Sequence, residues 1–166
     1  NDVDTPFPKK GAPPAFLTQF KDLLRRHPRN SIIWAHTGVG RIVHPVENHI
    51  AMLENILEDP VCAHVCFDLS WDEVAKYVVS SPEATQRTAD LLNKYPDRFL
   101  FGTDTVAPKD AQAYYAVYEM YQPLWKLLTP TTREKILKGN YERIFNEGRR
   151  NARAWEKAHA GENGLN

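Results

Sequence analysis

Three apolar runs of strand length alternate with segments of helical spacing, and no other feature of the sequence narrows the fold as much. The predicted strands cover residues 31–36, 61–69 and 99–103, and apolar residues recur at helical spacing around each of them. No turn signal of the kind that joins a hairpin lies between the strands, so successive strands should run parallel. The sequence therefore predicts an α/β fold made of parallel βα units.

The length and patterning predict one domain over residues 1–160 and a flexible tail at 161–166. The expected helices cover residues 15–26, 46–57, 71–79, 82–93, 110–128, 129–139, 140–145 and 149–160. Ser81, Asp110 and Asn140 are the expected helix caps. Trp155 should dock the last helix onto the rest of the domain.

Each predicted strand ends at or near a residue that can do chemistry: His36, Asp68 and Asp104. The carboxyl ends of parallel strands meet at one edge of a sheet, where ligands collect. A buried carboxylate needs a cation, a metal ion or a catalytic task, because burying it unpaired costs free energy. Asp104 could instead cap the turn that follows it, since aspartate is a favoured cap residue.

Alternation along the strands predicts which side chains share a face. Counting back by two, Trp34 shares the face of His36, and Cys66 shares the face of Asp68. The opposite, apolar face should pack under the helices. Cys62 and Cys66 would both lie on one strand, and we interpret them as small buried thiols rather than as a disulfide or a metal site.

Charge and hydropathy narrow the range of partners. Lysine plus arginine and aspartate plus glutamate both number 21, so no polybasic surface argues for nucleic acid or an anionic membrane. No apolar run approaches the ~20 residues of a membrane span. We expect a small-molecule substrate and favour a cytoplasmic location, although a targeting peptide could have been removed, because the chain lacks an initiator methionine.

Three segments carry a resemblance to a known family. Ile32-Ile-Trp-Ala-His36-Thr-Gly, Phe99-Leu-Phe-Gly-Thr-Asp104 and Lys138-Gly-Asn-Tyr-Glu-Arg-Ile-Phe145 resemble, in this order, the last third of an amidohydrolase-2-type metal-dependent hydrolase. That family includes hydrolases and aromatic-acid decarboxylases on a TIM-type (β/α)8 barrel. The resemblance implies that this chain forms the C-terminal part of such a barrel, from about the end of its fifth strand onward.

The resemblance also implies roles for two residues. Asp104 matches the strand-eight aspartate, a metal ligand that also serves as a base, and His36 matches the strand-six histidine, a metal ligand or a nearby acid/base. The implied cofactor is a divalent metal, zinc in particular, which lowers the pKa of bound water. The family's His-x-His on strand one and its histidine on strand five have no counterpart here, and metal sites need three or more protein ligands. We therefore expect the partner to be a missing N-terminal half of the barrel, or another copy through self-association.

Other candidates carry weaker signals. Arg41 could hold a substrate carboxylate, but a solvated loop arginine is the alternative. Asp68 and Trp71 could line the substrate pocket, but a capping aspartate and a core tryptophan are equally good interpretations. His44 and His49 lie near a helix start without a recognised metal spacing, so we expect them at the surface.

Three functions remain open from the sequence. The first is a metal-dependent hydrolase in which the strand-end histidine and aspartate assist the attack of metal-bound water on a small carboxylate- or amide-containing substrate. A metal-dependent decarboxylase of the same family is its close alternative. The second is a non-catalytic α/β remnant that binds a ligand or partner. The third is an unrelated three-stranded α/β module whose strand-end polar residues act as caps.

Overall fold

The computed structural model describes residues 17–38 and 49–160. Its centre is a sheet of three parallel strands, β1 (Ile32–Trp34), β2 (Val65–Asp68) and β3 (Phe99–Leu100), in the order β1-β2-β3. The register pairs Ile33 with Cys66 and Asp68 with Leu100. This sheet confirms the predicted α/β class and the parallel direction of the strands, although each strand is shorter than the sequence suggested.

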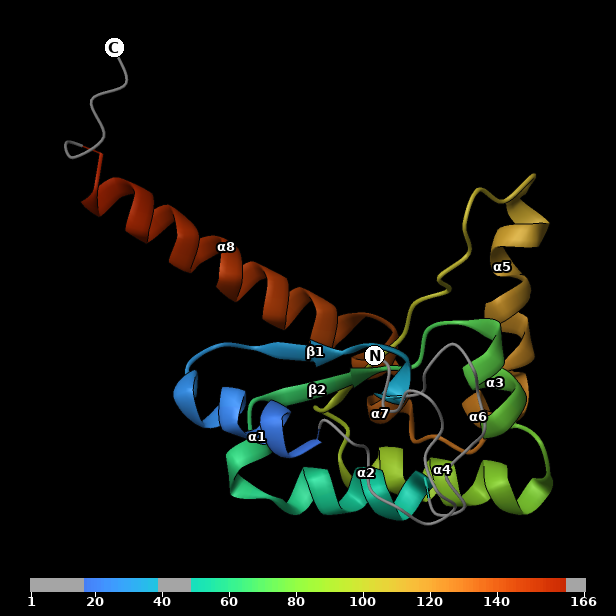
Figure 1. The fold of residues 1–166 in the computed structure, drawn as a ribbon. Helices are drawn as coiled ribbons and strands as arrows, with labels where there is room; N and C mark the ends of the chain where they lie inside the picture. The colour runs from blue at the N-terminus through green and yellow to red at the C-terminus, as the bar shows by residue number, and fades with distance from the viewer. Residues whose placement is uncertain (1–16, 39–48, 161–166) are drawn as a thin grey trace.

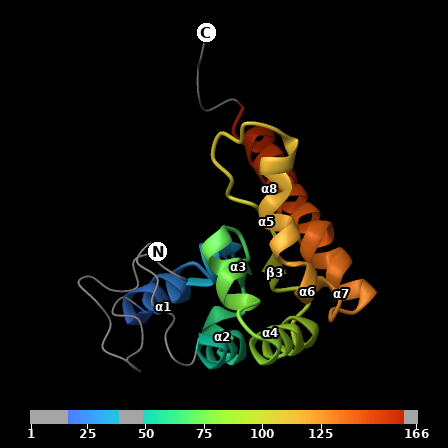
Figure 2. The ribbon, with the colours of Figure 1, turned by 90° about the vertical axis from the view of Figure 1, so that its right-hand side faces the viewer.

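Helices surround the sheet unevenly. They are α1 (Leu17–Arg26), α2 (His49–Glu58), α3 (Asp72–Val78), α4 (Pro82–Lys94), α5 (Ala111–Met120), α6 (Gln122–Trp125), α7 (Pro130–Glu134) and α8 (Asn140–Ala158), with the short turns η1 (Ala35–Gly38) and η2 (Pro60–Cys62) and the π-helical segment η3 (Lys135–Gly139). Helices α1, α2 and α4 lie on one side of the sheet, whereas α8 begins on the other side and projects away (Figures 1 and 2). Within the described residues, no helix combines the length and the apolar character needed to cross a bilayer.

The main core lies between the sheet and these helices. The ring of Phe67 stacks against Trp34 at 5.7 Å and against Phe99 at 5.8 Å. Leu24 from α1 and Leu53 from α2 are buried in the same cluster. Burying each of these side chains contributes roughly 1.5–3 kcal/mol, so this layer supplies much of the free energy of folding.

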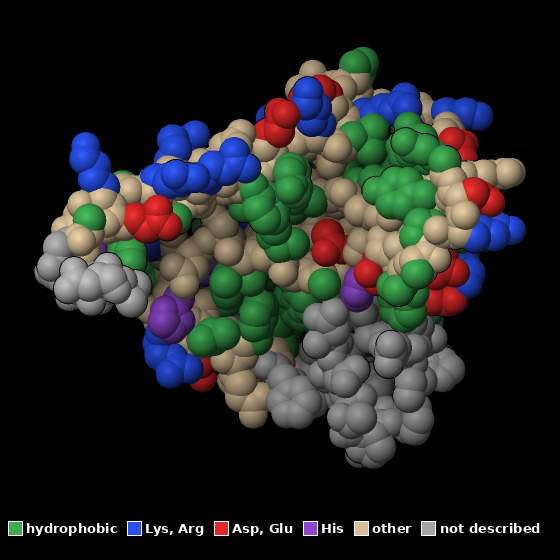
Figure 3. All heavy atoms as spheres, turned by 90° about the horizontal axis from the view of Figure 1, so that it is seen from above, with side chains coloured by type: hydrophobic (Ala, Val, Ile, Leu, Met, Phe, Trp, Pro, Cys, Tyr) green, Lys and Arg blue, Asp and Glu red, His purple; other side chains and the backbone are tan. Residues whose placement is uncertain are grey.

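The opposite face of the sheet carries a smaller apolar cluster of Cys66, Leu100 and Ile144, with Ile33 packed against it. Figure 3, seen from this side, shows hydrophobic side chains gathered in the middle of the face and acidic side chains among them.

The sequence placed Trp34 on the face of His36, opposite the face that packs under the helices, and this prediction was wrong. Trp34 packs in the helix-side core, and Ile33 is the residue that shares a face with Cys66. The count back from His36 failed because β1 ends at Trp34 and His36 lies in the turn that follows, where strand alternation no longer applies.

The outer edge of β3 is covered by the segment that leads into α8. The backbone N–H of Phe101 donates to the carbonyl of Ile136 at 3.1 Å. The side-chain amide of Asn140 donates to the carbonyls of Phe99 and Pro96, both at 2.8 Å. Asn140 thus ties α8 to the strand and is not the helix cap that the sequence predicted.

The remaining differences concern where helices break. One continuous α8 replaces the two predicted C-terminal helices, and the Trp155 side chain is 58% exposed rather than docked. The predicted helix over 110–128 divides after Met120, where Pro123 in the first turn of α6 lacks a backbone N–H. Ser81 and Asp110 cap α4 and α5 as predicted, accepting hydrogen bonds from the N–H groups at Ala84 and Ala113.

Both cysteines are free and buried, as expected. Cys62, however, lies in η2 rather than in the strand, because Pro60 begins a tight turn that the Asp59 carboxylate caps through the N–H of Val61. Burial raises the pKa of both thiols. The predicted tail at 161–166 lies outside the described residues.

Candidate functional site

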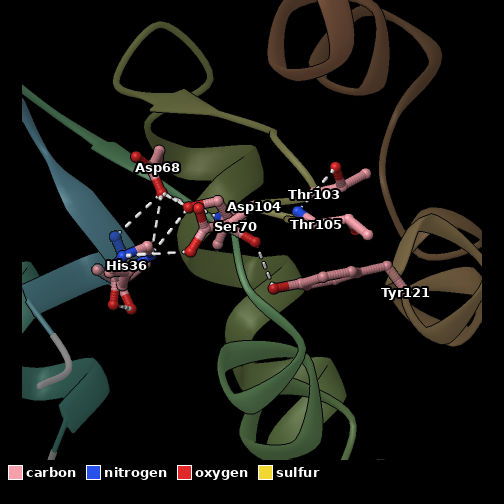
Figure 4. A network of polar contacts seen from close by, with 9 residues as sticks. His36, Asp68, Ser70, Thr103, Asp104, Thr105 and Tyr121 are labelled. Atoms are coloured by element: carbon pink, nitrogen blue, oxygen red, sulfur yellow. Dashed lines mark hydrogen bonds and ion pairs between the residues drawn. The ribbon is translucent and has the colours of Figure 1, made fainter. Parts of the chain in front are cut away.

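Polar side chains from three strand ends meet at the carboxyl edge of the sheet (Figure 4). His36 lies in η1 directly after β1, Asp68 is the last residue of β2, and Asp104 follows β3 by four residues. His36 Nε2 lies 3.8 Å from Asp104 Oδ2, and His36 Nδ1 lies 3.9 Å from Asp68 Oδ1. The convergence of position 36 with position 104, which the sequence predicted, is therefore present in the structure.

The backbone at this edge is strained. His36, Thr37, Trp71 and Asp104 have positive φ angles of 56°, 51°, 85° and 50°. Among the described non-glycine residues only Ala107 shares this conformation, and it follows Asp104 closely. Each such residue costs roughly 1–3 kcal/mol, and residues of this kind cluster at active sites and ligand clamps. The clustering supports a functional site at the strand ends over a set of ordinary turn caps.

The left-handed turn explains how His36 reaches the site. The strand ends at Trp34, and the positive φ angles at His36 and Thr37 turn the chain back over the sheet edge. The N–H of His36 donates to Asp68 Oδ1 at 3.0 Å, which ties the end of β1 to the end of β2. Strand alternation alone could not reveal this, because alternation stops where the strand stops.

Asp68 Oδ1 is a shared acceptor. Besides the His36 N–H, it accepts the N–H of Ser70 at 3.0 Å and the hydroxyl of Ser70 at 2.5 Å. Asp68 therefore caps the turn that follows β2, as one of the two sequence interpretations held. Its contact with a substrate stays a prediction.

Ser70 is the site residue that the sequence reading missed. Its Oγ lies 2.9 Å from His36 Nδ1, and the residue is buried. Its signal in the sequence is the spacing Asp68-Leu-Ser70, in which an aspartate at the end of a strand bonds the backbone two residues on. That spacing is common in turns, so on its own it does not identify a site residue.

Trp71 lies beside the histidine. Its ring centroid is 5.3 Å from that of His36, and the two planes are tilted by 55°. The N–H of Trp71 donates to the carbonyl of Thr103 at 3.3 Å, which joins the loop after β2 to the loop after β3. Trp71 also packs against the main core, so the core interpretation of this residue is correct, and its role in substrate binding stays a prediction.

His49 is partly buried rather than at the surface. Its Nε2 lies 2.9 Å from the carbonyl oxygen of Thr37, and since a carbonyl only accepts, Nε2 carries the proton. Desolvation by burial lowers the pKa of His49, and the bond to Thr37 opposes that shift only in part. The neutral ring thus supports the turn that carries His36. Arg41 and His44 lie outside the described residues.

The pair of His36 and Asp104 fits part of a metal site. Two ligand atoms bonded at ~2.1 Å to one ion are at most ~4.2 Å apart, and Nε2 and Oδ2 are 3.8 Å apart. Thr105 Oγ1, next to Asp104, is buried and has no hydrogen-bond partner in the described part of the chain. Across the residues that the structure describes, no group of three His, Cys, Asp or Glu side chains is placed to hold an ion. The pair therefore needs at least one further ligand.

Comparison with known proteins yields a single result. No curated protein and no solved structure matches the chain. A family model described as Amidohydrolase matches residues 9–146, a span that includes the three strands, both strand-end residues His36 and Asp104, and the first part of α8. The match covers most of the 166 residues and agrees with the family that the sequence resembles. The chain belongs to the amidohydrolase family.

Proposed function

We propose that this chain supplies part of the active site of a metal-dependent hydrolase that acts on a small carboxylate- or amide-containing substrate. One observation carries the proposal: a histidine nitrogen after β1 and a carboxylate oxygen after β3 lie 3.8 Å apart, although β2 separates their strands. Membership of the amidohydrolase family supports hydrolase-type chemistry at this pair.

The residues divide the work by their chemistry. Asp104, whose side chain is 48% exposed, is open to solvent and can accept a proton from water or substrate, and it also serves as a ligand. His36 presents Nε2 beside it, as a ligand or as an acid/base. A divalent metal ion, zinc in this proposal, would lower the pKa of water at the site toward neutrality. Trp71 and Asp68 form the wall beside His36, and Arg41 is proposed to bind a substrate carboxylate.

The additional ligands would come from other strands of a (β/α)8 barrel. The three parallel strands, adjacent in chain order, support this proposal, because consecutive βα units of such a barrel also lie side by side in chain order. In the described residues β1 has a neighbour on one side only, which leaves its other edge for a further strand. We propose that an N-terminal half of the barrel pairs there and completes the site.

The test is the turnover of a panel of small amides, esters and carboxylic acids by the intact protein with added zinc, with Asp104→Asn as the variant. We expect turnover to fall by at least ~100-fold, as when a catalytic acid/base is removed, with little change in the unfolding midpoint. Asp110→Asn is the matched control, because Asp110 caps α5 away from the site.

The outcomes distinguish hydrolysis from decarboxylation, and a catalytic role of Asp104 from a capping role. Release of carbon dioxide from a carboxylic acid, with no hydrolysis, would replace the hydrolase proposal with the decarboxylase. Turnover unaffected by Asp104→Asn would contradict the assigned role. Lowered stability of Asp104→Asn by about 1 kcal/mol, without any effect on turnover, would mark Asp104 as a turn cap.

A further inference from the structure

Ser70 lies between a carboxylate and the proposed catalytic histidine. Its buried Oγ is 2.5 Å from Asp68 Oδ1 and 2.9 Å from His36 Nδ1 (Figure 4). A carboxylate can only accept, whereas a hydroxyl has one proton to donate. The Ser70 proton is therefore directed at Asp68.

This assignment fixes the proton of the histidine ring. Since the Ser70 proton is committed to Asp68, Ser70 Oγ acts as an acceptor toward His36, so Nδ1 must carry the proton. The two carboxylate charges do not decide the tautomer, because Asp68 lies 3.9 Å from Nδ1 and Asp104 lies 3.8 Å from Nε2, so the hydrogen bond to Ser70 decides it. A neutral imidazole carries a single ring proton. Nε2 is then bare, and its lone pair lies on the side of Asp104.

We propose that Ser70 and Asp68 are positioning residues that hold His36 in the Nδ1–H tautomer and so present a bare Nε2 toward Asp104. The inference rests on the proposed function for its purpose, because a bare nitrogen is what a metal ligand or general base requires. Its structural content is independent of that function, because it follows from the hydrogen bonds alone.

Asp68 also fixes where the ring sits. The same Oδ1 that accepts the Ser70 hydroxyl holds the backbone N–H of His36 and that of Ser70. One carboxylate oxygen thus orients both the hydroxyl that sets the tautomer and the strained turn that carries the ring. In metal sites, loss of such an outer partner costs about 10- to 100-fold in metal affinity.

The test is a nitrogen-15 NMR measurement of the histidine rings in the metal-free intact protein, at about two pH units above the ordinary histidine pKa of ~6.5. The wild-type spectrum should show His36 with a protonated Nδ1 and a bare Nε2. Ser70→Ala should shift the population toward the Nε2–H form and weaken zinc binding by about 10- to 100-fold. Ser70→Thr keeps the hydroxyl and should restore both readouts.

Ser81→Ala is the matched control, since it removes a serine hydroxyl that caps α4 and leaves the site untouched. It should lower stability without changing the His36 tautomer. The inference would be overturned if the wild-type His36 carried its proton on Nε2. It would also be overturned if wild type and Ser70→Ala showed the same tautomer. If Ser70→Ala does not fold, the wild-type spectrum alone decides. If the protein shows the predicted tautomer but no hydrolytic turnover, the proposed function is contradicted and the inference about the tautomer is not.

Discussion

His49, the first residue of α2, donates a hydrogen bond from Nε2 to the carbonyl of Thr37, 2.9 Å away in the strained turn after β1. His36 is the neighbour of Thr37 in that turn, and both have positive φ angles. The turn is thus held from two sides, by the ring of His49 at one residue and by the carboxylate of Asp68 at the other. Helix α2 contributes no proposed catalytic group, but through His49 it helps to position His36.

Removing this donor should loosen the turn. We expect His49→Phe to lower the free energy of unfolding by about 1–3 kcal/mol, because it leaves the Thr37 carbonyl without its partner. His49→Gln, whose amide nitrogen can occupy a similar position, should cost less. Urea denaturation of both variants measures the difference, and equal losses would show that the hydrogen bond does not matter.

The same residue predicts a pH dependence of stability. Burial lowers the pKa of His49 below its ordinary value of 6.5, so the unfolded chain binds this proton more readily than the folded one. Stability should therefore be complete above pH 6.5 and should fall as the pH drops below it. Urea denaturation between about pH 5 and 8 should show a shallower decline for His49→Gln than for the wild type. Equal declines in the two proteins would contradict the assignment.

The stacked rings of the main core give a stability prediction. Phe67 is fully buried between Trp34 and Phe99, so Phe67→Ala should lower the free energy of unfolding by about 3–5 kcal/mol. Phe145 is 45% exposed on α8, and Phe145→Ala is the matched control with a loss of less than about 1 kcal/mol. Chemical denaturation compares the two variants, and similar losses would show that Phe67 does not contribute to stability as a core residue.

A buried tyrosine anchors the end of β2. The hydroxyl of Tyr121 donates to the carbonyl of Leu69 at 2.5 Å, and burial raises the pKa of this phenol. Tyr121→Phe should cost about 1–3 kcal/mol, because it leaves a buried carbonyl unpaired beside Ser70. Tyr114→Phe, at an exposed position of α5, is the control and should leave the free energy of unfolding nearly unchanged. Thermal denaturation of both variants measures the difference. A neutral Tyr121→Phe would show that the carbonyl finds another partner.

The exposed apolar surface predicts association. Tyr141 and Trp155 on α8 are more than half exposed, and β1 has a neighbour on only one side in the described part of the chain. Unpaired strand edges and apolar patches favour pairing with another chain. We expect this chain, expressed alone, to self-associate in analytical ultracentrifugation, and a stable monomer over a wide concentration range would contradict this.

Much of the fold followed from local patterns in the sequence. The direction of the strands and the caps at Ser81 and Asp110 were predictable, because the alternation of strands with helices and the capping of helices are visible in local sequence. Trp155 and Asn140 were misjudged for the opposite reason. Whether an aromatic residue docks, or an asparagine binds a strand instead of a cap, depends on tertiary contacts that no local pattern records.

The candidate site was predictable only in outline. His36 and Asp104 could be paired because polar residues at the ends of parallel strands share an edge. The left-handed turn that delivers His36, the hydroxyl of Ser70 and the support from His49 could not be predicted. Each depends on a hydrogen bond between residues that the fold, rather than the local sequence, brings together.

The most direct test of the central claim is the position of a metal ion. Anomalous diffraction at the zinc edge, from crystals of the intact protein grown with zinc, should show an ion ~2.0–2.2 Å from both His36 Nε2 and Asp104 Oδ2. Zinc bound elsewhere, with these two atoms too far apart to share an ion, would contradict the account.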